Sequence, residues 1–312
     1  MLKICMVGMG SIGMQHTRNL SCLLNRKGIS FQIDALRMLN KPLPDDVKGM
    51  VSYVYRSFDA LPCNYDIIFL NTPTSLHFEH LTLVLNHAQH IFIEKPVFDK
   101  FDYPWRDLPW HKNGVYYVAC PLRYHSVINY LVTLVKSLRI FSVRSICSSY
   151  LPDWRPGQDY RKIYSARSDQ GGGVRIDLIH EWDYLCYLFG RPASLQHFFG
   201  TFSDLEISSE DLAVYIAQYP DKIVSLHLDY FGRTKRREIE LFTSEDVIIC
   251  DLYNQTVRFT NKDETVSLPQ SRAEMQQAEL FAFLSMMSGK IANHNTISDA
   301  IETLRITLGV VD

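Results

Sequence analysis

The sequence predicts a two-domain α/β fold, with a doubly wound parallel sheet in the first domain and an open, mainly antiparallel sheet in the second. Buried strand patterns alternate with helix patterns up to about residue 120, which is typical of a parallel sheet. After residue 193, strand patterns separated by turns follow one another, as in an antiparallel sheet. A chain of 312 residues is long for one small core, so we expect domains over residues 1–121 and 122–312.

Composition and charge exclude several classes of protein. The chain has 32 basic and 34 acidic residues, a formal net charge of −2, and no basic patch that would indicate nucleic-acid binding. No apolar run reaches transmembrane length and no secretory signal precedes the first strand, so we expect a cytoplasmic protein without a membrane partner. The seven cysteines are scattered without a C-x-x-C pair, which favours reduced thiols over disulfides or zinc. No metal site is expected.

The first strand and the loop after it form a nucleotide-binding pattern. Apolar residues 2–7 predict a buried strand, and G-x-G-x-x-G follows before a helix pattern. Gly8 allows the tight turn, Gly10 lets the backbone approach a pyrophosphate, and Gly13 permits close packing of helix and strand. The helix N-terminus offers N–H groups and a positive dipole end to phosphate. The dinucleotide-binding residues predicted in this loop are Gly8, Gly10, Ser11, Ile12 and Gly13.

The end of the second strand decides which cofactor is expected. The apolar run over residues 29–36 continues through Leu36, which places Arg37 at the strand tip with Lys41 close behind. An acid at the tip would accept hydrogen bonds from the ribose of NAD, whereas an arginine accommodates the 2′-phosphate of NADP. Asp34 lies near the expected distance from the glycines and keeps NAD open. We therefore expect NAD(P), with a preference for NADP.

Two further buried strands end in polar segments. Residues 66–70 lead into Asn71-Thr72-Pro73, and residues 91–93 lead into Glu94-Lys95-Pro96. Proline ends the second of these strands because it cannot donate to a ladder. One more strand is predicted over residues 115–120. Right-handed crossovers bring such strand ends to one edge of the sheet, where ligands bind. The other cofactor-binding residues that we predict are Arg37, Asn71, Thr72, Pro73, His77, Glu94 and Lys95.

A long loop in the second half carries aromatic and basic residues together. Residues 152–161 contain two arginines flanked by Trp154 and Tyr160. A segment of this length without regular structure is typical of a functional loop, although an exposed linker or a subunit contact would have a similar composition. Arginine forks suit phosphate or carboxylate, and aromatic faces suit sugar rings, so we expect an anionic sugar or sugar nucleotide as the substrate.

A glycine-rich segment then opens a helix pattern that carries acids and a histidine. Gly171-Gly172-Gly173 precedes the pattern, which runs to Phe189. Asp177 and His180 are three residues apart, so their side chains can touch on one face of the helix. A carboxylate beside an imidazole fixes its tautomer and raises its basicity, as in a general base, although an ordinary solvated face would look similar. The predicted substrate-binding residues are Arg123, Trp154, Arg155, Tyr160, Arg161, Asp177 and His180.

Strand patterns dominate the rest of the chain. Turn residues at 219–222 and 253–255 join neighbouring strands as hairpins. We expect one face of this sheet to pack on helices and the other to meet a second subunit. From residue 127 onward we predict helices at 127–138, 273–288 and 298–310 and strands at 140–150, 195–202, 212–219, 223–230, 238–242, 247–251 and 256–260.

Four motifs, in this order along the chain, resemble the glucose–fructose oxidoreductase / inositol dehydrogenase / MocA family. They are Gly8-x-Gly10-x-x-Gly13-x-x-His16, Asn71-Thr72-Pro73 with His77, Glu94-Lys95-Pro96, and Gly171-Gly172-Gly173 with Asp177, His180 and Asp183. The resemblance spans essentially the whole chain. It implies a Rossmann domain, a C-terminal α/β domain whose open sheet serves oligomer contacts, and NAD(P)-dependent oxidation or reduction of sugars or related alcohols.

The resemblance also implies roles for individual residues. In the family, the lysine of E-K-P and the aspartate and histidine of the glycine-led helix surround the reacting carbon, which maps these roles onto Lys95, Asp177 and His180. The family helix commonly reads D-x-x-x-H, whereas here it is D-x-x-H, so Asp183 or Glu181 could serve in place of Asp177. The 152–161 loop and the His180-Glu181 pair are similar to members associated with bacterial surface-polysaccharide sugars.

Two classes of function remain open on the sequence. In the first, an oxidoreductase acts on a sugar or sugar nucleotide: His180 takes the hydroxyl proton, oriented by Asp177, and Lys95 donates a hydrogen bond to the substrate oxygen. In the second, a non-catalytic NAD(P)-binding protein of the same fold acts as a sensor or regulator. Lys95 and His180 together favour the enzyme, because a sensor needs neither. The open sheet predicts a homodimer or homotetramer.

Overall fold

The computed structural model describes residues 1–38 and 42–311. Lys41, expected to support Arg37, lies outside the described residues. In the part of the chain that is described, no helix is long and apolar enough to cross a membrane. The same residues contain no group of three or more histidine, cysteine, aspartate or glutamate side chains arranged to hold a metal ion. All seven cysteines are free thiols.

The described chain divides into two compact units. Met1–Cys120 and Arg272–Ile301 form the first unit, and Pro121–Ser271 with the chain from Glu302 onward forms the second. Arg272–Ile301 thus belongs to the first unit, whereas a division between residues 121 and 122 assigns it to the second. The helix pattern of this segment is clear in the sequence, but an apolar helix face does not specify which of two cores it covers.

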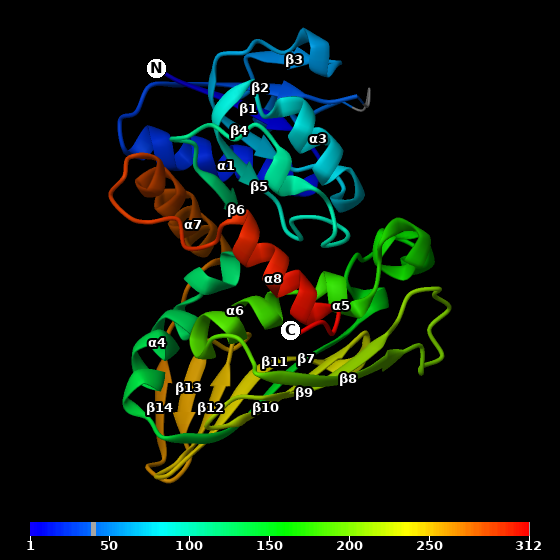
Figure 1. Cartoon of the computed structure of the whole chain (residues 1–312), viewed down its shortest axis with the longest axis vertical. Coiled ribbons are helices and arrows are strands. Elements are labelled where there is room, and N and C mark those ends of the chain that lie inside the picture. Colours follow the sequence, from blue (N-terminus) through cyan, green and yellow to red (C-terminus); the bar gives the residue numbers. More distant parts are fainter. Residues whose placement is uncertain (39–41, 312) are drawn as a thin grey trace. The chain divides into compact units, whose positions relative to one another are not determined.

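The first unit is built on a six-stranded sheet. Its strands are β1 (Leu2–Val7), β2 (Phe31–Leu36), β3 (Tyr53–Tyr55), β4 (Tyr65–Leu70), β5 (Ala88–Ile93) and β6 (Tyr116–Val118). Their order is β3-β2-β1-β4-β5-β6, and every neighbouring pair is parallel (Figure 1). The strand order reverses between β1 and β4, and ligands bind at such a reversal, beyond the carboxyl ends of the strands. The predicted doubly wound parallel sheet is confirmed.

Helices cover both faces of this sheet, which explains why β4 and β5 are apolar at successive positions. Phe69 and Phe92 stack on one face with centroids 4.8 Å apart, and both meet Phe283 of α7 edge-on. Ile68 and Ile91 belong instead to a buried cluster with residues of α3. The helices of this unit are α1 (Ser11–Arg26), α2 (Asp45–Lys48), α3 (His77–Val84) and α7 (Arg272–Met287), with 3-10 turns η1 (Phe58–Ala60), η2 (Thr74–Leu76) and η3 (Trp105–Asp107).

The second unit is built on an eight-stranded sheet. Its strands are β7 (Ile140–Tyr150), β8 (Ser194–Gly200), β9 (Leu212–Gln218), β10 (Ile223–Asp229), β11 (Phe231–Thr243), β12 (Val247–Asp251), β13 (Thr256–Phe259) and β14 (Glu264–Ser267). The order is β14-β13-β12-β11-β7-β10-β9-β8. Only β7 and β10 pair in parallel, so the prediction of a mainly antiparallel sheet is confirmed. The sequence missed β3 and β14 because both are short edge strands that lack a clear apolar alternation.

The helices of the second unit include one correction to the sequence analysis. The glycine-led helix predicted to run unbroken to Phe189 is two helices, because Leu178 leaves the helical region with φ −98° and ψ 22°. Asp177 ends the first helix and His180 begins the second. The helices are α4 (Ser126–Leu134), α5 (Val174–Asp177), α6 (His180–Phe189) and α8 (Ile297–Thr307), of which α8 contains residues of both units. The 3-10 turns are η4 (Pro121–Tyr124), η5 (Val135–Ser137), η6 (Leu151–Asp153), η7 (Tyr160–Lys162), η8 (Tyr164–Ala166) and η9 (Ser168–Gln170).

Candidate functional site

The loop between β1 and α1 is closely packed at two of its glycines and open at the third. A Cβ on Gly8 would lie 2.8 Å from the carbonyl oxygen of Asn71, and a Cβ on Gly13 would lie 2.2 Å from the carbonyl oxygen of Gly8. A Cβ on Gly10 would meet nothing within 4 Å. Gly8 also has φ +91°, which favours glycine. Two glycines therefore serve the turn itself, and Gly10 leaves room for a ligand where α1 begins with Ser11 and Ile12.

Asn71 lies beside this loop at the end of β4. Its backbone N–H donates to Val7 O at 2.8 Å, which ties the two strand tips together. The side chain is buried, and its Oδ1 has no hydrogen-bond partner among the described residues. An unpaired buried acceptor is costly, so Oδ1 is a position where a donor of a bound ligand is favoured.

The tip of β2 presents a guanidinium group without an acidic partner. Arg37 forms no ion pair with any described residue, and its buried Nε has no hydrogen-bond partner. Arg56 lies alongside and donates from Nη1 to Arg37 O at 3.1 Å. Burial and the positive charge of Arg56 lower the pKa of Arg37. Excess positive charge at this strand tip suits an anionic group of a ligand.

Asp34, the alternative reader of the ribose, is engaged within the sheet. Its carboxylate accepts from Tyr65 Oη at 2.8 Å and from Gln32 Nε2 at 3.0 Å. The residue is only 3% exposed. Asp34 thus has two partners in the fold, and Arg37 is the residue that directly follows β2.

Glu94 is held by a histidine of α1 at the tip of β5. The distance from His16 Nε2 to Glu94 Oε1 is 2.6 Å, and the other carboxylate oxygen of Glu94 accepts from the backbone N–H of Lys95 at 3.2 Å. Burial acts to raise the pKa of Glu94. The hydrogen bond and charge of His16, with the charge of Lys95, outweigh burial, so the pKa lies below its usual value. Glu94 is therefore an anchored carboxylate, and the Lys95 side chain that follows it is half-buried.

The ring of His77, which was predicted as a cofactor contact, is enclosed within the fold. The ring is 0% exposed. Its Nδ1 lies 2.9 Å from Pro96 O, and its Nε2 lies 2.8 Å from Thr72 O. Burial lowers the pKa of His77, and hydrogen bonds to these carbonyl groups only partly offset that effect. The side chain therefore joins the loops that follow β4 and β5 and is enclosed by them.

In the second unit, the Asp177 carboxylate lies between two tyrosine hydroxyls. Tyr164 donates to Oδ1, and Tyr230 donates to Oδ2 at 2.6 Å. Burial, and after it the negative charge of Asp177, raises the pKa of both tyrosines well above the usual value, so both are protonated donors at neutral pH. The sequence analysis missed both residues, because Tyr164 lies in an irregular loop and Tyr230 follows β10 without a motif.

The loop of residues 152–161 reaches the same cluster. Trp154 packs edge-on against Tyr230 with centroids 5.2 Å apart, and its Nε1 donates to Ser149 Oγ at 2.9 Å. The positive charge of Arg155 acts on the Tyr164 hydroxyl. The structure therefore brings Trp154 and Arg155 together with Asp177 through two tyrosines.

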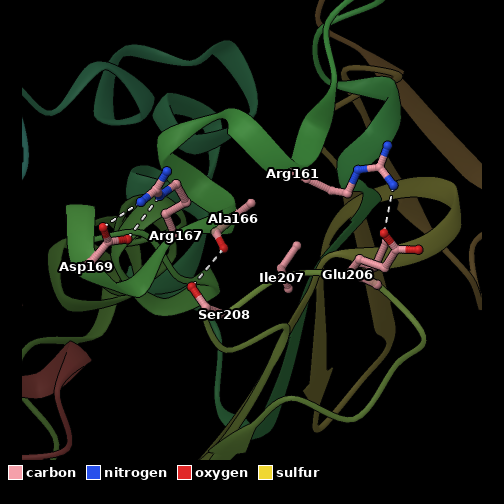
Figure 2. A pocket seen from close by; sticks show the side chains of 8 residues that line it. Arg161, Ala166, Arg167, Asp169, Glu206, Ile207 and Ser208 are labelled. Atoms are coloured by element: carbon pink, nitrogen blue, oxygen red, sulfur yellow. Dashed lines mark hydrogen bonds and ion pairs between the residues drawn. The ribbon is translucent and has the colours of Figure 1, made fainter.

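The two arginines of this loop differ in their partners. Arg161 bonds to Asp159 at 2.8 Å and to Glu206 at 2.7 Å, and Figure 2 shows its guanidinium reaching across to Glu206. Tyr160 lies in the same network, because its hydroxyl accepts from Glu206 N at 3.3 Å. Arg155 is exposed, and no acidic side chain among the described residues pairs with it. Of the two, Arg155 retains an unneutralised charge for an anionic ligand.

An open hollow of about 460 Å³ borders Arg161. Arg167, also on its wall, is bonded to Asp169 at 2.8 Å, and Ser208 donates to Ala166 O (Figure 2). Each arginine of the hollow thus has an acid of its own, and the hollow carries little net charge. We assign it no role in catalysis.

Two ion pairs fix the first turn of α6, just after His180. Glu181 is 0% exposed and lies 3.0 Å from Arg237 Nε. Asp183 accepts two hydrogen bonds from Arg123, at 3.1 and 2.7 Å. Both alternative acids are therefore engaged by arginines, as Asp177 is by two tyrosines. The orientation of His180 by Asp177 stays a prediction. Arg123 is 7% exposed, and its guanidinium is bonded to an acid of the fold, so the predicted substrate contact by Arg123 stays a prediction.

A dinucleotide fits the donor and acceptor groups of the first unit. The open side of Gly10 would give its phosphates access to the helix N-terminus, the unpaired Oδ1 of Asn71 would accept a hydrogen bond, and Arg37 would receive an anion. Direct contacts by Thr72, Pro73 and Glu94 stay predictions.

Comparisons with known proteins agree with this fold. A family model described as "Oxidoreductase family, NAD-binding Rossmann fold" (GFO/IDH/MocA) matches residues 2–103, and the model of the GFO/IDH/MocA C-terminal domain matches residues 129–249. No curated protein sequence matches the chain.

Three solved structures illustrate the similarity of fold. The UDP-N-acetylglucosamine 3-dehydrogenase GnnA from Acidithiobacillus ferrooxidans is 18% identical, with 99% of this chain and 96% of that chain covered and a TM-score of 0.79. A levoglucosan dehydrogenase in complex with NADH and levoglucosan is 15% identical, with 99% and 96% covered and a TM-score of 0.83. The WlbA dehydrogenase from Bordetella pertussis, in complex with NADH and UDP-GlcNAcA, is 15% identical, with 99% and 95% covered and a TM-score of 0.79.

Alanine at Gly13 should lower the stability of the fold, whereas alanine at Gly10 should weaken cofactor binding. At Gly13 the added Cβ meets backbone of Gly8, and overpacking of this kind typically costs about 1–3 kcal/mol of unfolding free energy. At Gly10 the Cβ enters open space, so the unfolding midpoint should stay near that of the wild type. Titration with NADPH, followed by fluorescence, should show that Gly10→Ala weakens binding about 10-fold or more, which is about 1.4 kcal/mol. Wild-type affinity in Gly10→Ala would contradict the placement of the ligand at this glycine.

Proposed function

Because this chain belongs to the GFO/IDH/MocA oxidoreductase family, we propose that it is an NAD(P)-dependent enzyme that transfers a hydride between the nicotinamide and a hydroxyl or carbonyl carbon of a sugar or sugar nucleotide. The observation that carries the proposal is the half-buried Lys95 at the end of β5, preceded by the anchored Glu94. An ammonium group at a strand tip near the predicted dinucleotide loop is suited to act on a substrate oxygen.

The proposal assigns one role to each candidate residue. When bound, the nicotinamide ring of the cofactor accepts or releases the hydride. Lys95 donates a hydrogen bond to the substrate oxygen and stabilises negative charge as it develops there. His180 removes the hydroxyl proton during oxidation and returns it during reduction. Asp177, held by Tyr164 and Tyr230, orients the imidazole.

Proteins of the same fold support the choice of substrate class. One of them is a dehydrogenase of UDP-N-acetylglucosamine, and another was solved with UDP-GlcNAcA. The resemblance of the 152–161 loop to members associated with surface-polysaccharide sugars points the same way, so we include a role in that metabolism in the proposal. The unneutralised charge of Arg155 agrees with a substrate that carries phosphate or carboxylate.

We also propose that the enzyme is a homodimer or homotetramer that associates through the open sheet of the second unit. Phe198 of β8 is 74% exposed and Ile216 of the adjacent β9 is 45% exposed. Exposed apolar side chains on neighbouring strands of a sheet are typical of a contact surface.

Removal of Lys95 or His180 should abolish most turnover while cofactor binding is retained. General base catalysis contributes about 100- to 10,000-fold, and loss of one oxyanion donor costs about 100- to 1,000-fold. Lys95→Ala and His180→Ala should therefore each lower kcat by about 100-fold or more. Asp177→Asn should cost less, because His180 is still present. A panel of sugars and nucleotide sugars, with reduced nicotinamide absorbance as the readout, measures these effects.

The control for this experiment is Lys100→Ala, which removes an exposed lysine that follows Lys95 in the sequence and should leave kcat unchanged. His180→Ala with wild-type turnover and an unmoved pH profile would contradict its role as the base. If the wild-type protein binds the cofactor but oxidises or reduces no member of the panel, the alternative of a non-catalytic sensor or regulator is favoured.

We propose a preference for NADP over NAD because Arg37 follows β2 and pairs with no acid among residues 1–38 and 42–311. A hydrogen bond to a charged group contributes about 1.5–3 kcal/mol, so Arg37→Ala should weaken NADPH binding by about 10- to 100-fold and change NADH binding little. Calorimetric titration of both nucleotides measures this difference. Arg258→Ala, which removes an exposed arginine of the second unit, controls for net charge. Tighter binding of NADH than NADPH, unchanged in Arg37→Ala, would contradict the preference.

The two arginines of the 152–161 loop should respond differently to substitution. Arg155→Ala should raise KM for an anionic substrate by about 10-fold or more with little change in kcat, because a charge-assisted hydrogen bond is lost. Arg161→Ala should have a smaller effect, since Asp159 and Glu206 already neutralise that guanidinium. Steady-state kinetics with the substrate that the panel identifies measures KM and kcat for both variants. Equal effects of the two substitutions would show that Arg155 is not a specific anion contact.

A further inference from the structure

We propose that two buried histidines, His16 and His77, position the Lys95 amine by holding the backbone on either side of it. The inference rests on the role proposed for Lys95 above. It assigns to both histidines a task that is separate from contact with cofactor or substrate. His16 is 2% exposed and His77 is 0% exposed, so neither ring is accessible to a bound molecule.

His16 holds the residue before Lys95. Its ring packs against Phe69 and Phe92, with centroids 5.7 and 5.1 Å away, and its Nε2 bonds to Glu94 Oε1 at 2.6 Å. The other ring nitrogen, Nδ1, is buried without a hydrogen-bond partner among the described residues. A proton on Nε2 therefore satisfies the ring better than a proton on Nδ1. Glu94 in turn accepts from the Lys95 backbone N–H at 3.2 Å, so the contact passes from α1 to the backbone of Lys95.

His77 holds the residues after Lys95. Its Nδ1 lies 2.9 Å from Pro96 O and 3.1 Å from Val97 O, and its Nε2 lies 2.8 Å from Thr72 O. All three partners are acceptors, and a neutral imidazole donates from one nitrogen only. Two acceptors face Nδ1 and one faces Nε2, so a proton on Nδ1 makes more hydrogen bonds. In that form, His77 bonds the segment directly after Lys95.

The positions of these bonds explain why they matter for Lys95. A lysine side chain is long and flexible, so its ammonium group reaches a defined position only if its backbone is fixed. The bonded carbonyl group belongs to the next residue, Pro96, and the bonded carboxylate belongs to the preceding residue, Glu94. Misplacement of a catalytic group by about 1 Å can cost about 100-fold in rate.

Amide side chains provide a test with opposite expectations at the two sites. The amide nitrogen of asparagine reaches about as far as Nδ1 of histidine, and that of glutamine reaches about as far as Nε2. His77→Asn therefore keeps the bond to Pro96, whereas the glutamine amide of His77→Gln reaches Thr72 O and loses the bond to Pro96. At position 16 the order reverses, since His16→Gln keeps the bond to Glu94 and His16→Asn does not. General destabilisation of the fold would not produce this reversal.

The first readout needs neither cofactor nor substrate. Competitive labelling of lysine amines with acetic anhydride over a range of pH, quantified by mass spectrometry, gives the reactivity and titration midpoint of Lys95, with Lys100 as an internal control. We expect His77→Gln and His16→Asn to shift the midpoint of Lys95 by about 1 pH unit, which is about 1.4 kcal/mol, or to change its reactivity several-fold. His77→Asn and His16→Gln should stay close to the wild type.

The second readout is the division between kcat and KM. His77→Gln and His16→Asn should lower kcat by about 10- to 100-fold with KM nearly unchanged, because a misplaced Lys95 loses transition-state contacts. Unchanged labelling of Lys95 in all four variants would overturn the inference, and so would equal losses from asparagine and glutamine at each site. Retained turnover in Lys95→Ala would refute the proposed function instead, and the labelling result would still decide whether the histidines hold Lys95.

Discussion

The hydrogen bond between His16 and Glu94 is the contact on which the candidate site of the first unit depends most. It joins the helix that follows the glycine loop to the strand tip that carries Lys95, so it links the nucleotide-binding loop to the segment of the lysine. In the second unit, too, paired side chains lie next to a candidate catalytic residue. His180 is half-buried, and its neighbours Glu181 and Asp183 are held by arginine partners. In both units, buried ionic contacts fix the backbone next to a more accessible reactive side chain.

The charges left without partners are as informative as those that are paired. Arg123 and Arg161 were predicted from sequence as substrate contacts, but each is bonded to acids of the fold. Arg37 and Arg155 have no acidic partner in the described residues. In an ion pair, the neighbouring acid already compensates the arginine for its loss of hydration. An arginine without an acidic partner gains more from binding an anionic group of a ligand. The sequence shows where arginines lie along the chain, and only the fold shows which of them are neutralised.

The ends of the parallel strands were predictable from sequence because apolar runs stop abruptly at Asn71 and Glu94. The spacing of the three glycines also predicted that two of them serve the turn and helix packing and that Gly10 faces the ligand. Partners across long separations were not predictable: His16 and Glu94 are 78 residues apart, and Arg123 and Asp183 are 60 residues apart. The tyrosines that hold Asp177 and the enclosure of His77 depend on such contacts. Local propensity does not encode them, since each is decided by tertiary packing.

Direct transfer of hydrogen from a sugar carbon to the cofactor is the central claim, and isotope transfer tests it most directly. The enzyme is incubated with NADP⁺ or NAD⁺ and nucleotide sugars deuterated at their carbinol carbons, and the reduced cofactor is analysed by mass spectrometry. The account predicts one deuterium per reduced nicotinamide with the wild-type protein. With Lys95→Ala, the rate of deuterium transfer should fall by about 100-fold or more. Cofactor that binds with normal affinity but gains no deuterium from any member of the panel would contradict the account.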